Sequence, residues 1–547
     1  MATSTAWDYV IVGGGIAGCV VASRLSEYKP SSRILVIEAG ADVSHDEEIL
    51  KFQSLNFIGG KFDWAYKTVP QKHYGGREID IPAGRALGGG SVINGCGWIR
   101  GARADFDSWA EIVDDHRWSY EGQLPYFKKT EKWYKSDNRD DHGHIGAMHI
   151  ESPKSTGRIY PLADITQKSW SDIGVQELPG CDMNAGENIG LGELNENRHK
   201  GARQTAPLAY PLKNVNVLPH TLVESIIIEK SPEVKATGVR LDDGAEIFAK
   251  EVIISAGAYR TPQVLMLSGI GPKETLQKHG IETKVDNPEV GKNFNDHVMV
   301  HFNWQLKDPS KGYAVGSANS LFAKPEFATG MPISFIINRE VPKDGLIAAI
   351  TKDEGKAPGP DHYLLKRRWG LMENIILYLS MPPHPVDGTH ISNAMMGAKP
   401  TSRGTVSIAS KNPADAPVLD PNYCATEVDR YVWRESIRET AALMMGDTPL
   451  GREVVAGETP SDGSEPLKIG SSDEYLDSRV RSLGRSTYHG SSSCSMGTVV
   501  DTDLRVKGVK NLRIVDASVF PISIGAHIQA AVYALAEQAA VIISQDQ

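Results

Sequence analysis

Cysteine is sparse in this 547-residue chain, and none of its five cysteines forms a C-x-x-C pair. Their odd number and wide scatter exclude a disulfide framework and a cysteine-bound zinc site. Glycosylation sequons of the N-x-[ST] type are also absent. We therefore expect a reducing compartment and predict a cytoplasmic protein.

Long apolar runs and a secretory leader are missing too. No stretch reaches the roughly 18 apolar residues that a membrane-spanning helix needs, and the polar start of the chain leads directly into the first predicted strand. The net charge of −10 is not that of a nucleic-acid-binding surface. We expect neither a membrane nor a nucleic acid among the partners of this protein.

The stretch from residue 7 to residue 40 has the pattern of strand, glycine-rich turn, helix and second strand. Residues 9–12 and 33–37 are short apolar runs, and apolar residues recur at helical spacing between them. Gly13, Gly15 and Gly18 have G-x-G-x-x-G spacing, and Glu38 follows 20 residues after the last of them. This arrangement predicts a dinucleotide-binding unit.

The residues of such a unit have separate physical tasks. Gly13 permits the tight turn, Gly15 lets the backbone approach a pyrophosphate, and Gly18 allows close packing of helix and strand. The helix N-terminus offers N–H groups and a positive dipole to the phosphates, and Glu38 accepts from a ribose hydroxyl. By itself this unit does not distinguish NAD from FAD.

Other local patterns predict further elements. A second glycine-rich loop at residues 84–95 contains three consecutive glycines beside Arg85 and Asn94, and we interpret it as a loop that contacts a flat or anionic ligand. The chain length requires two or more domains. The remaining predictions are strands at 215–218, 222–228 and 246–254, a turn-rich segment at 262–271, and helices at 426–446 and 526–543.

Several motifs together resemble the glucose–methanol–choline (GMC) family of flavin oxidoreductases. Residues 84–94 resemble its G-R-x-L-G-G-x-S-x-x-N signature, and residues 257–271 resemble its second signature. Residues 290–297 resemble the motif V-G-x-N-x-x-D-H. Because the match runs through nearly the whole chain, we identify it as similar to the fungal alcohol oxidases and dehydrogenases of that family.

The resemblance implies an α/β fold with a Rossmann-like FAD-binding domain of discontinuous segments and a substrate-binding α+β domain with a mostly antiparallel sheet. It divides the chain into an N-terminal, mainly FAD-binding region at 1–305, a variable substrate-domain segment at 306–398 and a C-terminal region at 399–547. Both a monomer and a homodimer remain open.

The resemblance also implies FAD rather than NAD as cofactor. Some relatives attach the flavin through a histidine in the loop at 90–94, where this chain has none, so we predict noncovalent FAD. We interpret Cys96, close to this loop, as a small packed residue. The residues implied to bind FAD are Gly13, Gly15, Ile16, Ala17, Gly18, Glu38, Arg85, Gly88, Ser91, Asn94, Gly95, Val223 through its backbone, Asp516, Ala517, Ile528 and Gln529.

Two histidines carry the chemistry that the resemblance implies. His489 lies in the segment that resembles the one bearing the family's catalytic base, and His527 lies where relatives have His or Asn. An imidazole with a pKa near neutrality suits removal of a hydroxyl proton and contributes ~10²–10⁴-fold. We assign proton abstraction to His489, orientation of the substrate hydroxyl to His527, and a place in the substrate pocket to Tyr488. His297 is interpreted as structural.

The predicted function is oxidation of the CH–OH group of an alcohol to a carbonyl, with hydride transfer to flavin N5. Aryl and secondary-metabolite alcohols are candidate substrates, and O2 or another acceptor takes the electrons. Two alternatives on the same scaffold remain open: an FAD-containing hydroxynitrile lyase, and a non-redox biosynthetic cyclase or dehydratase. No metal site is predicted, and no G-x-S-x-G elbow supports a Ser–His hydrolase.

Overall fold

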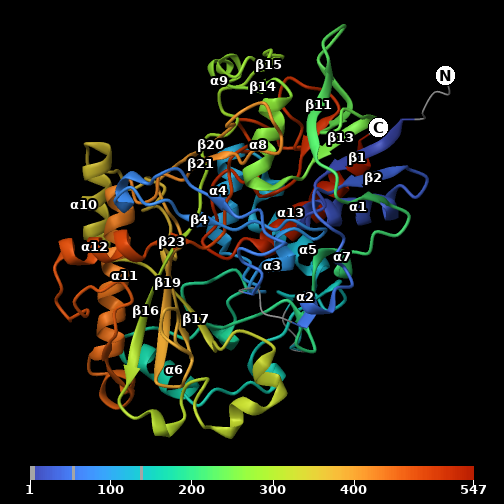
Figure 1. Cartoon of the computed structure of the whole chain (residues 1–547). Coiled ribbons are helices and arrows are strands. Elements are labelled where there is room, and N and C mark those ends of the chain that lie inside the picture. Colours follow the sequence, from blue (N-terminus) through green and yellow to red (C-terminus); the bar gives the residue numbers. More distant parts are fainter. Residues whose placement is uncertain (1–5, 52–55, 136–139, 547) are drawn as a thin grey trace.

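The computed structural model describes residues 6–51, 56–135 and 140–546. The first five residues, which bear on the predicted lack of a leader, lie outside these ranges. The described chain forms two large sheets with helices packed against them (Figure 1). None of its helices is long and apolar enough to cross a membrane.

The first sheet contains the predicted strand–helix–strand unit, as β1 (Trp7–Val12), α1 (Ile16–Tyr28) and β2 (Ile34–Ile37). β1 pairs in parallel with β2 on one side and with β13 (Glu246–Ile254) on the other. All four residues of β2 are buried, as expected for a strand covered on both faces. The α/β class is therefore confirmed.

Segments far apart in sequence complete this sheet. Its order is β10-β2-β1-β13-β12-β11, with β24 beside β13. Strands β12 and β11 run antiparallel to their neighbours, whereas β10, β2, β1, β13 and β24 pair in parallel. The added strands are β10 (Asn216–Leu218), β11 (Val223–Glu229), β12 (Lys235–Leu241) and β24 (Leu512–Ile514). The C-terminal helix α13 (Gln529–Gln545) packs on α1, so helices from the N-terminal and C-terminal regions of the chain meet here.

One local prediction is wrong. In the segment from Pro262 to Gly271, expected to be turn-rich, residues 262–267 instead continue helix α8 (Gly257–Leu267), and a turn at 268–269 leads into the short strand β14 (Ile270–Gly271). Pro262 has no N–H to donate to the carbonyl of Ala258 one turn earlier. The hydroxyl of Ser493, 235 residues away in sequence, donates to that carbonyl at 2.6 Å. A tertiary contact thus supplies the hydrogen bond that proline removes.

The second sheet is antiparallel throughout, which confirms the predicted mostly antiparallel sheet. Its order is β22-β16-β19-β18-β17-β7, with β23 beside β16. It draws strands from all three predicted regions of the chain, whose limits at 305 and 398 stay a prediction. The strands are β7 (Gly190–Glu193), β16 (Val298–Leu306), β17 (Phe335–Arg339), β18 (Met372–Leu377), β19 (His390–Gly397), β22 (Val455–Glu458) and β23 (Arg485–Ser486).

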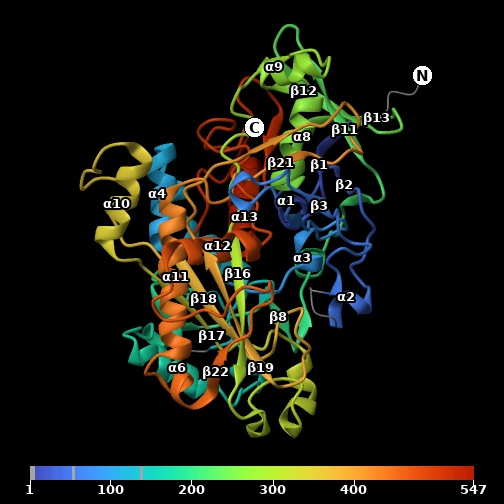
Figure 2. The same ribbon diagram turned by 60° about the vertical axis from the view of Figure 1, so that its left-hand side comes forward.

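The predicted helix at 426–446 is α11 (Glu427–Met445), which begins where the Thr426 hydroxyl accepts the N–H of Asp429. It packs against β18 and β19, and its neighbours are the helices α12 (Asp473–Leu483) and α10 (Lys343–Glu354) (Figure 2). The other α-helices are α2 (Glu47–Lys51), α3 (Gly90–Ile93), α4 (Arg103–Val113), α5 (Tyr120–Thr130), α6 (Ala163–Asp172), α7 (Ala206–Ala209) and α9 (Lys273–Lys278). Short strand pairs complete the fold: β3 (Tyr66–Lys67) with β4 (Asp80–Ile81), β5 (Glu131–Lys132) with β6 (Met148–His149), β8 (Arg198–His199) with β9 (Ala202–Arg203), β14 (Ile270–Gly271) with β15 (Val285–Asp286), and β20 (Thr405–Ser407) with β21 (Val418–Asp420).

Candidate active site

A cavity of about 460 Å³ is lined by residues of both sheets. Val12 and Val223 line it from the first sheet, and Ile336 and Ile375 line it from the second. Most predicted site residues lie on its wall. They are Gly13, Gly15, Ile16, Ala17, Glu38, Asn94, Gly95, Val223, Tyr488, His489, Asp516, Ala517, His527, Ile528 and Gln529.

The structure places Gly18, Gly88, Ser91 and Arg85 behind this wall. A Cβ on Gly18 would lie 2.1 Å from the carbonyl oxygen of Gly13, so this glycine lets α1 pack against the turn. The loop residues hold one another, because the Ser91 hydroxyl donates to the Gly88 carbonyl at 2.6 Å. The exposed Arg85 stacks its guanidinium 4.6 Å above the ring of Trp64, which does line the cavity. These four residues therefore support the wall.

The end of the cavity at the N-terminus of α1 fits a phosphate group. Gly15 is the N-cap of α1, and the first turn of that helix has no acidic residue. A Cβ on Gly15 would find no atom nearer than the Ser255 carbonyl oxygen at 3.9 Å, so the space in front of it is open. The carboxylate of Glu38 accepts the N–H groups of Gly14 and Gly40 at 2.9 and 2.7 Å, and burial raises its pKa.

Hydrogen bonds between distant segments hold other parts of the cavity wall. The Asn94 amide donates to the Gln529 side chain at 2.9 Å, and the side-chain oxygen of Asn94 accepts the backbone N–H of Cys96 at 3.0 Å. The carboxylate of Asp516 accepts the N–H of Gly257 at the start of α8, at 2.9 Å. Cys96 is fully buried and lines the cavity.

His489 and His527 lie together on the cavity wall. Their ring centroids are 5.0 Å apart and their planes make an angle of 78°. The backbone N–H of His489 donates to the buried carboxylate of Asp296 at 2.8 Å. The Nδ1 atom of His489 lies 3.1 Å from Thr487 Oγ1 and 3.0 Å from His297 Nδ1. Tyr488, next to His489 in the chain, has a left-handed φ of 67°, a conformation that costs energy for a side chain of this size.

The surroundings drive the two imidazoles toward opposite protonation states. Burial, together with His527 and His297, lowers the pKa of His489 well below its ordinary value. Burial acts in the same direction on His527, but the Glu373 carboxylate, 2.9 Å from its Nε2, outweighs burial and raises the pKa of His527. The lowered pKa of His489 favours a neutral proton acceptor, and the raised pKa of His527 favours a protonated ring beside it, an arrangement suited to acid–base chemistry.

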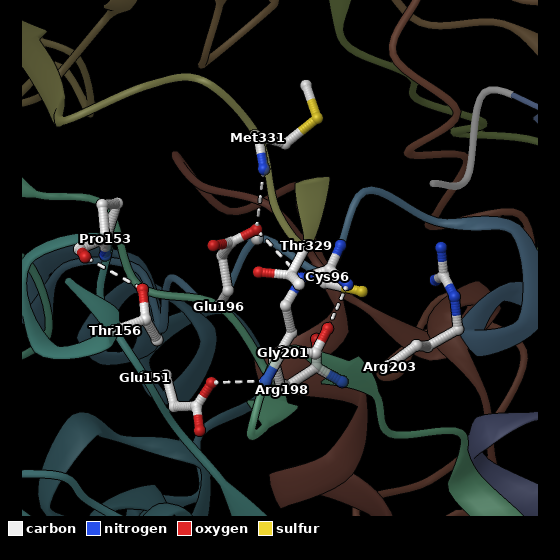
Figure 3. Close-up of polar contacts among 12 residues, drawn as sticks. Cys96, Glu151, Pro153, Thr156, Glu196, Arg198, Gly201, Arg203, Thr329 and Met331 are labelled. Atoms are coloured by element: carbon white, nitrogen blue, oxygen red, sulfur yellow. Dashed lines mark hydrogen bonds and ion pairs between the residues drawn. The ribbon is translucent and has the colours of Figure 1, made fainter. Parts of the chain in front are cut away.

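An apolar wall faces the histidines from the second sheet and the segments beside it. We use this name for Leu194, Met299, Met331, Ile333, Ile336 and Ile375. Met331 is clamped through its backbone: its N–H donates to Glu196 at 3.2 Å (Figure 3), and its carbonyl accepts from Arg158 at 3.3 Å. Glu196 is buried between Arg158 and Arg198, so an ion-pair cluster positions this part of the wall.

Known proteins resemble this chain along its whole length. Residues 7–299 and 400–536 match the two family profiles described as GMC oxidoreductase. The chain is 40% identical over 544 residues to the GMC-type oxidoreductase acuG of Aspergillus aculeatus, covering 98% of this chain and 99% of that protein. It is 32% identical to the oxygen-dependent choline dehydrogenase of Vibrio vulnificus, covering 99% and 95%. The structure of pyridoxine 4-oxidase from Mesorbium loti superposes with a TM-score of 0.83 at 28% identity, covering 99% and 100%.

The chain belongs to the GMC oxidoreductase family. Membership defines the cofactor as FAD and the reaction as oxidation of a CH–OH donor by an enzyme with a small-molecule substrate and an electron acceptor. The open backbone at Gly15 and the unopposed dipole of α1 fit the pyrophosphate of FAD. The loop at 90–94 has no histidine for a covalent link, in keeping with noncovalent FAD.

Sequence reasoning missed two side chains of this GMC oxidoreductase's site. Glu373 lies on β18, in a region without any motif, so only the fold reveals its bond to His527. His297 does lie in a motif, but nothing local shows that its ring contacts His489. The described residues contain no group of three or more His, Cys, Asp or Glu side chains that could hold a metal ion.

Proposed function

We propose that this protein oxidises a primary alcohol carrying an apolar group, aryl alcohols included, to the aldehyde. The observation that carries the proposal is a pair of imidazoles, His489 and His527, with ring centroids 5.0 Å apart beside the apolar wall and with pKa values shifted in opposite directions. A substrate hydroxyl between the two rings would meet a proton acceptor and a positive charge together.

The two histidines divide the work on the hydroxyl group. His489 accepts the hydroxyl proton, because burial keeps its imidazole neutral near pH 7. His527, held as an imidazolium by Glu373, stabilises the negative charge that develops on the oxygen. Bound FAD supplies the acceptor for the hydrogen and electron pair that leave the carbon.

The lining of the cavity supports the substrate class. The apolar wall is made of aliphatic and thioether side chains, which favour an apolar or aromatic group. Among the described lining residues the carboxylates are Glu38 and Asp516, and both already accept backbone N–H groups. The six residues of the apolar wall thus offer no carboxylate for a quaternary ammonium group and no hydroxyl for a sugar.

Anaerobic bleaching of the FAD-loaded protein tests this proposal. Benzyl alcohol, 1-hexanol, choline and glucose are mixed with the protein at equal concentration, and flavin absorbance is followed. We expect benzyl alcohol to bleach fastest, and His489→Gln to slow bleaching by ~10²–10⁴-fold with FAD content unchanged. Faster bleaching by choline or glucose would contradict the substrate class.

Two further measurements distinguish a hydroxynitrile lyase from an alcohol oxidoreductase and identify the electron acceptor. Cleavage of a cyanohydrin to aldehyde and cyanide without bleaching would replace the proposal with a lyase. Admission of air after bleaching, followed by a peroxide assay, determines whether O2 accepts the electrons.

A further inference from the structure

We infer that His297 is a positioning residue that fixes the tautomer of His489 and thereby presents the bare Nε2 of that imidazole to the cavity. Only the kinetic consequence of this inference rests on the proposed function. The tautomer is a property of the folded protein and is measurable without a substrate.

The two imidazoles meet through like atoms. Nδ1 of His297 lies 3.0 Å from Nδ1 of His489, and the ring planes make an angle of 89°. This contact is a hydrogen bond only when one of the two nitrogens carries a proton and the other does not.

Both rings are neutral near pH 7. Burial, with the positive charges of His527 and Lys399, lowers the pKa of His297 to about 3. The pKa of His489 is lowered well below its ordinary value for the same main reason. A single proton therefore lies between the two Nδ1 atoms.

Neighbouring hydroxyl groups decide which ring carries that proton. The Thr487 hydroxyl donates to the His297 carbonyl at 3.0 Å, so a lone pair of its oxygen faces His489 Nδ1 at 3.1 Å. On the other side, Ser523 Oγ lies 2.8 Å from His297 Nε2 and can accept an N–H there. One assignment satisfies every contact: Nδ1–H of His489 donates to His297 and Thr487, and Nε2–H of His297 donates to Ser523.

This assignment leaves a lone pair on Nε2 of His489. No protein hydrogen-bond partner for that nitrogen exists among the described residues, and the ring is only partly buried where it lines the cavity. Proton abstraction needs this lone pair, whereas the opposite tautomer would present an N–H to the substrate hydroxyl. His297 thus acts on the reaction through His489.

Two amide variants separate positioning from packing. In His297→Asn the amide lies near the position of Nδ1 and can accept from His489, whereas in His297→Gln it lies near the position of Nε2. We expect the Gln variant to reduce flavin on the order of 10- to 100-fold more slowly, with KM within about twofold of wild type. The Asn variant should keep most of the rate. If His297 acted only by packing, His297→Gln would keep more of the flavin-reduction rate than His297→Asn, because Gln fills more of the space that the imidazole occupies.

Nitrogen-15 NMR of the FAD-loaded, histidine-labelled protein reads the tautomer directly. The histidine signals that disappear from the spectrum of His489→Gln are those of the His489 ring. We expect a protonated Nδ1 and a bare Nε2 in wild type and in His297→Asn, and a changed pattern in His297→Gln. The control His301→Leu removes another buried histidine, on β16, and should change neither the rate nor the His489 signals.

The outcomes are distinguishable. A bare Nδ1 in the wild-type His489, or equal flavin-reduction rates and tautomer patterns in the two amide variants, would overturn the inference. If no alcohol bleaches the wild type, the proposed function fails, and the NMR comparison alone decides the role of His297.

Discussion

Nε2 of His527 lies 2.9 Å from Oε1 of Glu373, across 154 residues of sequence. The pair joins the loop before α13 to strand β18 of the second sheet. Because Glu373 is only 2% exposed, solvent screens its charge poorly, and its effect on the imidazole is strong. This contact shifts the pKa of His527 in the direction opposite to that of His489.

Glu373→Gln should remove the charge of His527 near neutral pH. In wild type the carboxylate raises the pKa of His527 against burial, whereas in the variant burial acts alone and lowers it. Activity that needs the imidazolium is present below this pKa and is lost as pH rises through it. The alkaline limb of the flavin-reduction rate should therefore move to lower pH, as measured by stopped-flow absorbance.

A matched control for this prediction is Glu439→Gln. It removes a carboxylate that lies 2.9 Å from Arg339 and does not line the cavity. Its pH profile should match wild type. An unmoved alkaline limb in Glu373→Gln would show that the charge of His527 is not required.

Gly15→Ala and Gly18→Ala should fail in different ways. In Gly15→Ala the added Cβ would project into open space where the FAD pyrophosphate fits, so this variant should fold but bind FAD weakly. In Gly18→Ala the Cβ would lie 2.1 Å from the Gly13 carbonyl oxygen, so this variant should lose stability. FAD titration and thermal unfolding of the apoprotein distinguish the two results. Equal melting temperatures of the two variant apoproteins would contradict the packing role of Gly18.

Arg158→Met should weaken both the fold and the apolar wall. Breaking a buried ion pair such as that of Arg158 with Glu196 costs about 3–5 kcal/mol of unfolding free energy. Release of the Met331 carbonyl should also raise KM for bulky aryl alcohols. In Arg103→Met, which removes an exposed pair with Glu121, the loss should stay within about 1 kcal/mol. Chemical denaturation measures the loss of unfolding free energy in Arg158→Met and in Arg103→Met. Equal losses in the two variants would contradict the stabilising role of the buried pair.

His301→Leu should reduce the loss of stability in acid. Burial, with Arg485, lowers the pKa of His301 from 6.5 to about 4. Between these values the unfolded chain binds a proton that the folded protein does not, so stability is full above about pH 6.5 and falls as pH decreases. Between pH 6.5 and 5 the variant should lose about 2 kcal/mol less unfolding free energy than wild type. A wild-type slope of stability against pH in His301→Leu would contradict the prediction.

Much of the fold could be predicted because its signals are local. The strand–helix–strand unit at residues 7–37 and helix α11 follow from hydrophobic spacing, which depends on neighbours within a few turns of chain. Helix α8 could not be predicted, because Ser493 replaces the hydrogen bond that Pro262 removes. Strand β12 was not predicted either, and only a glycine fits at its position 238, because the β13 backbone approaches that position closely.

By itself the sequence determined the family, the FAD cofactor and the two histidines that meet in the cavity, because those residues lie in motifs. The tertiary structure alone decided how the histidines differ. Glu373 and His297 reach His527 and His489 across 154 and 192 residues, and burial sets the strength of both contacts. Protonation depends on what surrounds an imidazole in space, and the order of residues along the chain does not record those surroundings.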